Sequence, residues 1–367
     1  MSGLIKKICH ITTVHPRFDV RIFYKECMSL ASTYIVYLIV ADGKGDEVKN
    51  NVHIIDVSKG SDSRINRILF TTRRAYKKAL DLNCEIYHFH DPEFLFCGLK
   101  LRYKSKKVIY DVHEDVPKQT LSKDYINPLL RKIISLFLNL TEKVVSRRLS
   151  SVVTVTQSIN KRFSEYNKHS FIINNYPDLD IFKINSGFNR SGICYVGNIS
   201  PIRGLEFVLQ SLGPIDTVLH LAGAFESEEF ERKLMTHPNW SKVNYYGVVD
   251  SEKAIAIIQS SLAGLVTYLP VPNHLEAQPN KMFEYMASGT PVIASDFPLW
   301  KEIIEVNNCG ICVDPRDLKS IANAINYFLK NPDVVKSMGI NGQKIVNEKY
   351  NWNTEKIKLL ALYASIK

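Results

Sequence analysis

The chain has 367 residues, of which 45% are apolar and 23% are charged, and its formal net charge is +10. This length and composition are ordinary for a globular protein with two domains. No run of 18 or more apolar residues is present, so no transmembrane helix is expected. The first residues lack the apolar region and cleavage site of a secretory signal, so we expect the chain in the cytosol. The positive charge favours anionic partners: nucleic acid, anionic lipid or phosphate-bearing substrates.

The seven cysteines are scattered and odd in number, which favours reduced thiols over a disulfide framework. Cys309 and Cys312 have the spacing of a redox motif. The residues after them indicate a turn that leads into a strand, and no further zinc ligands are close in the sequence. We therefore interpret this pair as structural.

Apolar strand-like runs alternate with helical patterns along the whole chain. In the first half the expected strands are 7–11, 35–40, 53–56, 85–88, 108–111, 151–155 and 171–173. The helices expected between them lie near 20–32, 63–82, 92–102, 126–149 and 157–166. In the second half the expected strands lie near 192–196, 217–221, 243–246, 263–267, 291–295 and 310–313. The helices there are expected near 203–212, 226–236, 251–261, 280–288, 298–306, 316–330, 332–348 and 352–365.

This alternation predicts an α/β fold with parallel sheets that helices cover on both faces. The two series predict two doubly wound domains, 1–175 and 191–350, followed by a C-terminal helix at 351–367. The hinge is expected at 176–190, which is polar and contains Pro177 and Gly187. Open parallel sheets bind ligands at the carboxyl ends of their strands, so a cleft between the two domains is the expected reaction site.

Residues 275–296 carry the most informative pattern of the chain. Glu276 and Glu284 lie eight positions apart, with a Pro-Asn helix start between them and a Ser-Gly-Thr-Pro turn and an apolar strand after them. A helix N-terminus suits a phosphate, because its N–H groups are unpaired and its dipole is positive there. A glutamate one turn inside the helix can accept hydrogen bonds from a ribose diol. The pattern therefore indicates a site for a nucleoside diphosphate with a sugar attached.

A second pattern opens the second domain, at residues 194–204. Gly197 ends a strand and lets a ligand approach the backbone closely, and Arg203 stands at the entrance of the next helix. A guanidinium can form a bidentate fork to phosphate oxygens, although such a turn also occurs without any ligand.

Together, Val196-Gly197-Asn198, Arg203-Gly204 and the Glu276 to Glu284 segment with its SGTPVIAS continuation resemble glycosyltransferase family 4. The resemblance is strongest over 192–350. Members of this family are retaining enzymes with the GT-B fold, in which two Rossmann-like domains face each other across a cleft and the last helix returns to the N-terminal domain. Within the family, the chain resembles the bacterial surface-polysaccharide type.

The resemblance implies roles for residues of the second domain. Glu284 would bind the ribose, and Arg203 would take the place of the family's usual lysine beside the diphosphate. The donor sugar hydroxyls and a phosphate would be held by Glu276 and by the backbone of Ala277, Gln278, Pro279 and Asn280. Asn198 stands where many members have arginine, and Lys281 would supply the missing cation.

In the first domain the resemblance points to His113, which follows the strand at 108–111. His113 would contact the donor sugar or the acceptor near the reacting carbon, and the alternative is a hydrogen-bonded turn histidine. Together with Arg203 and Glu276 it completes the expected catalytic set. The acceptor side is expected to include Asp19, Arg21, His90, Asp91 and Glu114. Asp19 is expected to cap the next helix, and Arg21 or Lys25 to reach into the cleft, although the loop at 12–21 lacks the glycine pair of many members.

A metal site is not expected. His88 and His90 lie on one strand face and could bind a metal, but no further ligand set is evident from the sequence. Asp178 and Asp180 have Asp-x-Asp spacing, yet they fall in the hinge, where turn chemistry explains them. By resemblance, the only small molecule required is the nucleoside diphosphate sugar, which is a substrate.

Residues 126–148 form an apolar helical stripe with basic residues at both ends. The stripe includes Leu129, Ile133, Leu136, Phe137 and Leu140. One interpretation is an amphipathic helix packed on its own domain. The other is peripheral attachment to anionic lipid on the inner face of the cell membrane, near a lipid-linked acceptor.

We therefore predict a retaining hexosyltransferase that acts on a saccharide or lipid-linked saccharide in cell-surface polysaccharide synthesis. One alternative is a nucleotide-sugar 2-epimerase, which would turn over the donor without an acceptor. Another alternative is a basic nucleic-acid-binding protein. The lack of a recognisable nucleic-acid-recognition motif argues against it. A third alternative is a relative of these enzymes that has lost catalysis. The presence of both Glu276 and Glu284 argues against it.

Overall fold

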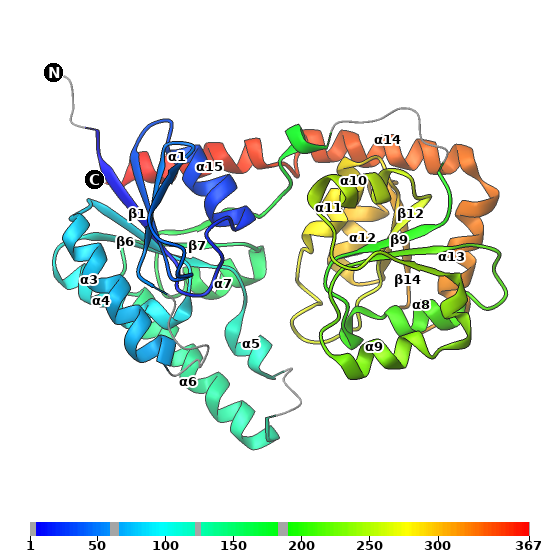
Figure 1. The fold of residues 1–367 in the computed structure, drawn as a ribbon, viewed down its shortest axis with the longest axis horizontal. Helices are drawn as coiled ribbons and strands as arrows, with labels where there is room; N and C mark the ends of the chain where they lie inside the picture. The colour runs from blue at the N-terminus through cyan, green and yellow to red at the C-terminus, as the bar shows by residue number, and fades with distance from the viewer. Residues whose placement is uncertain (1–4, 59–65, 122–125, 183–189, 367) are drawn as a thin grey trace. The chain divides into compact units, whose positions relative to one another are not determined.

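A computed structural model of the chain describes residues 5–58, 66–121, 126–182 and 190–366. The chain forms two compact units, the first made of Met1–Asn175 with Trp352–Lys367 and the second of Tyr176–Asn351 (Figure 1). Part of the expected hinge, 183–189, lies outside the described residues.

The first unit is built on an eight-stranded sheet in the order β3-β4-β2-β1-β5-β6-β7-β8. All its pairs are parallel except β3 with β4. Its strands are β1 (Lys7–Ile11), β2 (Ile35–Val40), β3 (Glu47–Lys49), β4 (Val52–Asp56), β5 (Ile86–Phe89), β6 (Lys107–Val112), β7 (Ser151–Thr154) and β8 (Ser170–Ile172).

Helices cover both faces of this sheet, because the strands alternate buried side chains toward two separate cores. One core contains side chains from α3 (Thr72–Leu82), α4 (Leu95–Tyr103), α6 (Pro128–Ser146) and α7 (Gln157–Ser164). The other contains side chains from η1 (Val20–Cys27), α1 (Met28–Leu30) and α15 (Trp352–Ser365). The remaining helical segments are η2 (Arg67–Thr71), η3 (Pro92–Phe94) and α5 (Val116–Leu121).

The helix α15 returns to the first unit after the whole second unit. Its Trp352 indole donates to Ser29 Oγ over 3.1 Å, and Glu355 accepts from the amide of Asn174 over 2.8 Å. Tyr363 is fully buried among the histidines of β1 and β5. These contacts confirm that the last helix packs on the N-terminal sheet.

The second unit is built on a six-stranded parallel sheet in the order β11-β10-β9-β12-β13-β14. Its strands are β9 (Ile193–Val196), β10 (Leu219–Ala222), β11 (Val243–Tyr245), β12 (Ala263–Val266), β13 (Val292–Ser295) and β14 (Gly310–Val313). Its α-helices are α8 (Leu205–Ser211), α9 (Glu228–Met235), α10 (Ser251–Gln259), α11 (Asn280–Ala287), α12 (Pro298–Ile304), α13 (Leu318–Lys330) and α14 (Pro332–Glu348). Short turns of helix occur at η4 (Leu179–Ile181), η5 (Pro201–Arg203) and η6 (Pro238–Lys242).

The predicted α/β class with two parallel sheets is confirmed, and the prediction missed one strand and one α-helix of the described residues. The strand β3 has the sequence Glu-Val-Lys and lies at the sheet edge with its last two residues exposed, so it has no apolar run to reveal it. The helix α5 is six residues long with Pro117 in its first turn. Cys312 lies in β14 and Cys309 just before it, and both are free thiols.

Within the described ranges, no helix combines the length and apolarity needed to cross a membrane.

Candidate functional site

The loops after β9 and β12 meet at the carboxyl edge of the second sheet, because the two strands are parallel neighbours. After β9, Gly197 has φ +124° and Gly204 has φ +75°. A methyl group on Gly204 would lie 1.9 Å from the carbonyl oxygen of Thr267, just after β12. The two loops are therefore packed backbone against backbone, and Arg203 is held at their junction.

Arg203 and Lys281 converge on one aromatic ring at this edge. The guanidinium carbon of Arg203 lies 4.1 Å from the ring centre of Tyr268, and Lys281 Nζ lies 5.6 Å from the same centre. Lys281 Nζ also lies 3.5 Å from the ring centre of Tyr195. The aromatic faces attract both cations and hold them close to each other.

The electrostatics of this pair favour an anionic ligand. Burial, reinforced by the charge of Arg203 and only partly opposed by Glu284, holds the pKa of Lys281 well below its usual range. Arg203 Nε is buried without a hydrogen-bond partner. A phosphate between them would relieve the repulsion and accept from the unused N–H group.

Lys281 stands beside the glycine turn. A methyl group on Gly197 would lie 3.0 Å from Lys281 Nζ. Asn198 is exposed, and its carbonyl oxygen accepts from the Tyr195 hydroxyl over 2.6 Å. The amine of Lys281 thus lies next to Gly197, the residue before Asn198.

The segment before α11 is fixed by its own hydrogen bonds. Trp300 Nε1 donates to the carbonyl oxygen of Ala277 over 2.7 Å, and the hydroxyl of Tyr176 bonds Gln278 Oε1 over 2.9 Å. Pro279 precedes the first helical residue, Asn280, and no side chain caps this N-terminus.

The two glutamates of the motif differ in exposure. Glu276 is exposed on the loop, whereas Glu284 is half-buried in α11. The negative charge of Glu284 acts on both Lys281 and Tyr268, which places it at the same edge as the two cations.

In the first unit, His113 belongs to a cluster at the ends of β1, β5 and β6. His113 Nε2 lies 2.8 Å from Asp111 Oδ2, and His90 Nδ1 lies 3.1 Å from the same oxygen. The rings of His15 and His113 are 5.1 Å apart, and His15 Nε2 lies 3.6 Å from Asp91 Oδ1. His113 retains 17% of its side-chain exposure, so its imidazole remains accessible.

Asp111 organises this cluster. It is fully buried and accepts two bonds of 2.9 Å from Arg21. Burial alone would raise its pKa, but Arg21 and then His113 outweigh burial and hold the pKa of Asp111 well below its usual range. A charged Asp111 orients the imidazole of His113 through the 2.8 Å contact.

Arg21 differs from the prediction. It is 3% exposed, and besides Asp111 it contacts Glu26 over 3.1 Å and the carbonyl oxygen of Ile173 over 3.0 Å. The sequence predicts that Arg21 or Lys25 reaches into the cleft, whereas the structure buries Arg21 among these partners and places Lys25 Nζ 2.6 Å from Asn175 Oδ1. Arg21 thus contacts Asp111, which in turn contacts His113.

The other residues predicted for the acceptor side belong to the same unit. Asp19 caps η1, where it accepts from the amides of Arg21 and Ile22 over 2.9 Å. Asp91 is buried and accepts from the hydroxyl of Thr12 over 3.1 Å and from the amide of Thr13. Glu114 is exposed and bonds the side chain of Gln119.

A buried group of His10, Glu26, His88 and His90 has the geometry of a possible metal site, of which the sequence indicated only His88 and His90. Imidazole contacts link its members: His10 Nδ1 lies 3.0 Å from His90 Nε2, and Tyr363 bonds both His10 and His88. Arg21 lies against Glu26 and opposes a further cation. The absence of a bound metal therefore stays a prediction.

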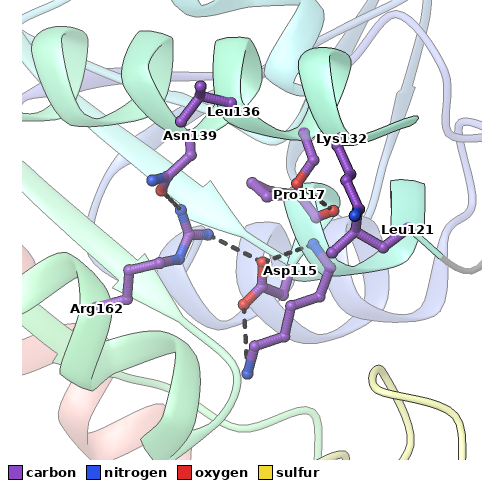
Figure 2. A pocket seen from close by; sticks show the side chains of 9 residues that line it. Asp115, Pro117, Leu121, Lys132, Leu136, Asn139 and Arg162 are labelled. Atoms are coloured by element: carbon purple, nitrogen blue, oxygen red, sulfur yellow. Dashed lines mark hydrogen bonds and ion pairs between the residues drawn. The ribbon is translucent and has the colours of Figure 1, made fainter. Parts of the chain in front are cut away.

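A cavity of about 370 Å³ opens between α5, α6 and α7 (Figure 2). Arg162 lies 3.5 Å from Asp115 across it and bonds Glu142 over 2.6 Å. Apolar side chains of Pro117, Leu121 and Leu136 also line it, together with the polar side chains of Lys118, Lys132, Ser135 and Asn139. Sequence reasoning did not single out this cavity, although Asp115 follows His113 by two residues.

Two family models match the chain, one for each unit. The model described as Glycosyltransferase Family 4 matches residues 7–180, and the model described as Glycosyl transferases group 1 matches residues 178–345. The chain belongs to the family 4 glycosyltransferases.

Characterised and uncharacterised relatives agree with this placement. This glycosyltransferase is 24% identical over 278 residues to an uncharacterized glycosyltransferase of Methanocaldococcus jannaschii, with 70% of this chain and 68% of that protein covered. It is 22% identical to the MMP alpha-(1->4)-mannosyltransferase of Mycolicibacterium hassiacum, with 60% of this chain covered. That second match spans 56% of the length of the mannosyltransferase.

Solved structures share the fold. Sucrose-phosphate synthase from Thermosynechococcus elongatus superposes with a TM-score of 0.79 at 18% identity, covering 98% of both chains. Anabaena Alr3699/HepE in complex with UDP superposes with a TM-score of 0.75 at 14% identity, covering 98% of this chain and 100% of that one. The glycosyltransferase thus has the predicted GT-B fold.

Proposed function

We propose that this glycosyltransferase transfers a hexose from a nucleoside diphosphate sugar to an acceptor hydroxyl with retention of configuration. The acceptor would be a saccharide or a lipid-linked saccharide of a cell-surface polysaccharide. The single observation that carries the donor class is the convergence of Arg203 and Lys281 at the glycine turn. Anabaena HepE, which shares the fold, has been solved with UDP and with UDP-glucose, and this supports a nucleotide donor.

In this proposal the diphosphate lies against Arg203, Lys281 and the N-terminus of α11, and Glu284 accepts from the ribose hydroxyls. Glu276 and the backbone of Ala277 to Asn280 would contact the donor sugar. The two cations stabilise the negative charge that builds on the leaving phosphate as it departs.

The reaction breaks the bond between the sugar C1 and the β-phosphate oxygen, and the electron pair stays on that oxygen. The acceptor oxygen then bonds C1 on the same face, through a state with oxocarbenium character. The acceptor's proton passes to the leaving phosphate. His113, held by Asp111, would contact the donor sugar or the acceptor near the reacting carbon.

Thermal unfolding with UDP, GDP and ADP in turn tests the donor site. We expect at least one of them to raise the unfolding midpoint, because ligands that bind only the folded state stabilise it. Glu284→Ala should abolish that rise, while Glu252→Ala, an exposed glutamate of α10, should leave it intact. An unchanged rise in Glu284→Ala would remove Glu284 from the ribose site.

Product analysis separates transfer from epimerisation. The nucleoside diphosphate sugar that corresponds to the stabilising nucleotide is incubated with and without mixed saccharide acceptors. We expect the sugar to be transferred to acceptor with an unchanged anomeric configuration. Interconversion of the donor at C2 without acceptor would instead establish an epimerase, and a covalent glycosyl adduct on Glu276 would overturn the same-face route.

A further inference from the structure

The helix α6 exposes an apolar face that its own unit does not cover. Of its residues, only Glu142, Val145 and Ser146 are buried, so none from Pro128 to Thr141 belongs to the core. Seven large apolar side chains of this helix are between 41% and 69% exposed: Leu129, Leu130, Ile133, Leu136, Phe137, Leu140 and Val144. The interpretation of α6 as a helix packed by its apolar stripe on its own domain is therefore wrong.

Neighbouring elements of the same helical layer expose further apolar side chains. The helix α4 packs against α6, and its Phe96 is 60% exposed. Phe70 of η2, which leads into α3, is also 60% exposed. In Figure 1, α3, α4 and α6 follow one another along one side of the first sheet. The exposed apolar face of α6 itself is of the kind that marks an interaction site.

The exposed charges of α6 and its C-terminal end are positive. Lys132, Arg147 and Arg148 are exposed on or directly after α6, whereas its single carboxylate, Glu142, is buried and paired with Arg162. The helix α4 carries Lys100 and Arg102 and no acidic residue. An apolar face with a positive rim complements a surface that is apolar inside and anionic at its edge.

We propose that α6 lies in the interface of an anionic lipid bilayer. Its exposed apolar side chains would enter the boundary of the acyl chains, while Lys132, Arg147 and Arg148 contact anionic headgroups. A second copy of the chain fits less well, because a symmetric contact would bring the positive rims of two α6 helices together. In this proposal α6 attaches the protein to the membrane surface and does not cross the membrane. This agrees with its exposed basic residues and with the finding that no helix of the described ranges is long and apolar enough to span a membrane.

The cavity of Figure 2 extends this surface inward. Leu136 belongs both to the exposed stripe and to the cavity wall, and Lys132 and Lys118 line the same cavity. Headgroups bound at α6 would therefore lie next to a partly apolar recess with cationic side chains.

Cosedimentation of the full chain with lipid vesicles tests the proposal. Vesicles of phosphatidylcholine with about 30% phosphatidylglycerol are compared with pure phosphatidylcholine, because anionic lipid attracts a basic surface. We expect at least roughly tenfold stronger binding to the anionic vesicles, and a clear loss between about 0.1 M and about 0.5 M salt.

Two sets of variants locate the surface. Leu129→Ser/Ile133→Ser/Phe137→Ser should weaken binding to anionic vesicles at least roughly tenfold, as should Lys132→Glu/Arg147→Glu/Arg148→Glu. Ile340→Ser/Ile357→Ser removes two apolar side chains that are 56% and 69% exposed on α14 and α15, and this matched control should bind as the native chain does. Unfolding midpoints of all variants, with and without UDP, GDP or ADP, verify the fold and report on the donor site independently.

Three results would overturn the proposal. The first is that the native chain does not bind anionic vesicles. The second is that the control variant loses as much vesicle binding as the α6 variants do. The third is that the native chain is a dimer in solution and that only the α6 variants are monomers. The last result would assign the face to a second copy. Loss of the nucleotide effect in the native chain would count against the proposed function and leave the membrane result standing.

Discussion

Substituting Lys281 by methionine should change stability and nucleotide affinity in opposite directions. Burial beside Arg203 disfavours the charged form of Lys281, and replacing buried charged groups by apolar side chains is often neutral or stabilises by about 1–4 kcal/mol. The lost contact with the Tyr195 ring offsets about 0.5–2 kcal/mol of this gain. We expect a net stabilisation of about 1 kcal/mol, which raises the unfolding midpoint by about 2–4 °C.

The same substitution removes a charge-assisted contact with the diphosphate. Such a contact contributes about 1.5–3 kcal/mol, so the Kd should rise by roughly tenfold or more. A ligand present at about 100 times its Kd stabilises by about 2.7 kcal/mol, and a tenfold weaker one by about 1.4 kcal/mol. The stabilisation by nucleotide should therefore fall by at least half.

The assay is thermal unfolding of the native chain and Lys281→Met, each with and without the nucleoside diphosphate that stabilises the native chain. Lys253→Met is the control, because Lys253 is exposed and its ammonium lies 5.6 Å from the ring centre of Tyr246. Since the pKa of Lys281 is lowered in the folded chain, its penalty is largest at low pH and disappears as pH rises toward its ordinary value of 10.5. A destabilised Lys281→Met with an unchanged nucleotide effect would refute the reasoning.

The remaining predictions concern packing, pH and metal. Gly223→Ala would place a methyl group 2.0 Å from the carbonyl oxygen of Gly197. Gly247→Ala is the control, because its site also has positive φ but open space around it. In urea unfolding, Gly223→Ala should lower the free energy of unfolding by at least about 2 kcal/mol more than Gly247→Ala. For Asp19, burial alone would raise the pKa, but His15 and the amide of Ile22 lower it from 3.8 to about 2. Asp19 therefore contributes roughly 2 kcal/mol of stability that is present above pH 3.8 and is lost as pH falls toward 2. Asp19→Asn should remove this dependence of stability on pH while keeping the helix cap. The same loss of stability at low pH in Asp19→Asn as in the native chain would contradict the prediction. Elemental analysis of the purified chain should find far less than one equivalent of metal, and EDTA should leave nucleotide binding intact. If the native chain instead contained one equivalent of metal and His88→Ala contained none, the buried histidines would hold a metal.

The sequence predicts the sheets well and their edges poorly. Buried parallel strands such as β2 and β12 are uninterrupted apolar runs, which a sequence displays directly. The edge strand β3 has no such run, since its last two residues are exposed and it pairs on one side only.

The cation pair of the second unit follows from sequence for a different reason. Glycine turns and the Glu276 to Glu284 spacing are local features, so Arg203 and Lys281 could be predicted without knowing the strand order. The contact of Tyr268 with both cations could not be predicted from the sequence, because the pairing of β12 with β9 brings its ring to them.

The network of the first unit is mostly invisible in the sequence. Asp111 meets Arg21 only because β1 lies beside β5 and β5 beside β6. The same order brings His10 against His90. For α6, periodicity predicts an apolar face but not which surroundings it meets, and the structure leaves that face exposed.

The return of α15 to the first sheet sets the order in which a ribosome could complete the two units. Side chains of α15, among them Leu359 and Tyr363, fill the core beneath β1 and β5, yet they are synthesised after the entire second unit. Domains usually fold in the order of their synthesis. Here the second unit can finish its core first, while the first unit waits with part of its sheet uncovered. Chaperones that protect exposed apolar strands are therefore expected to bind nascent chains of this protein until α15 emerges.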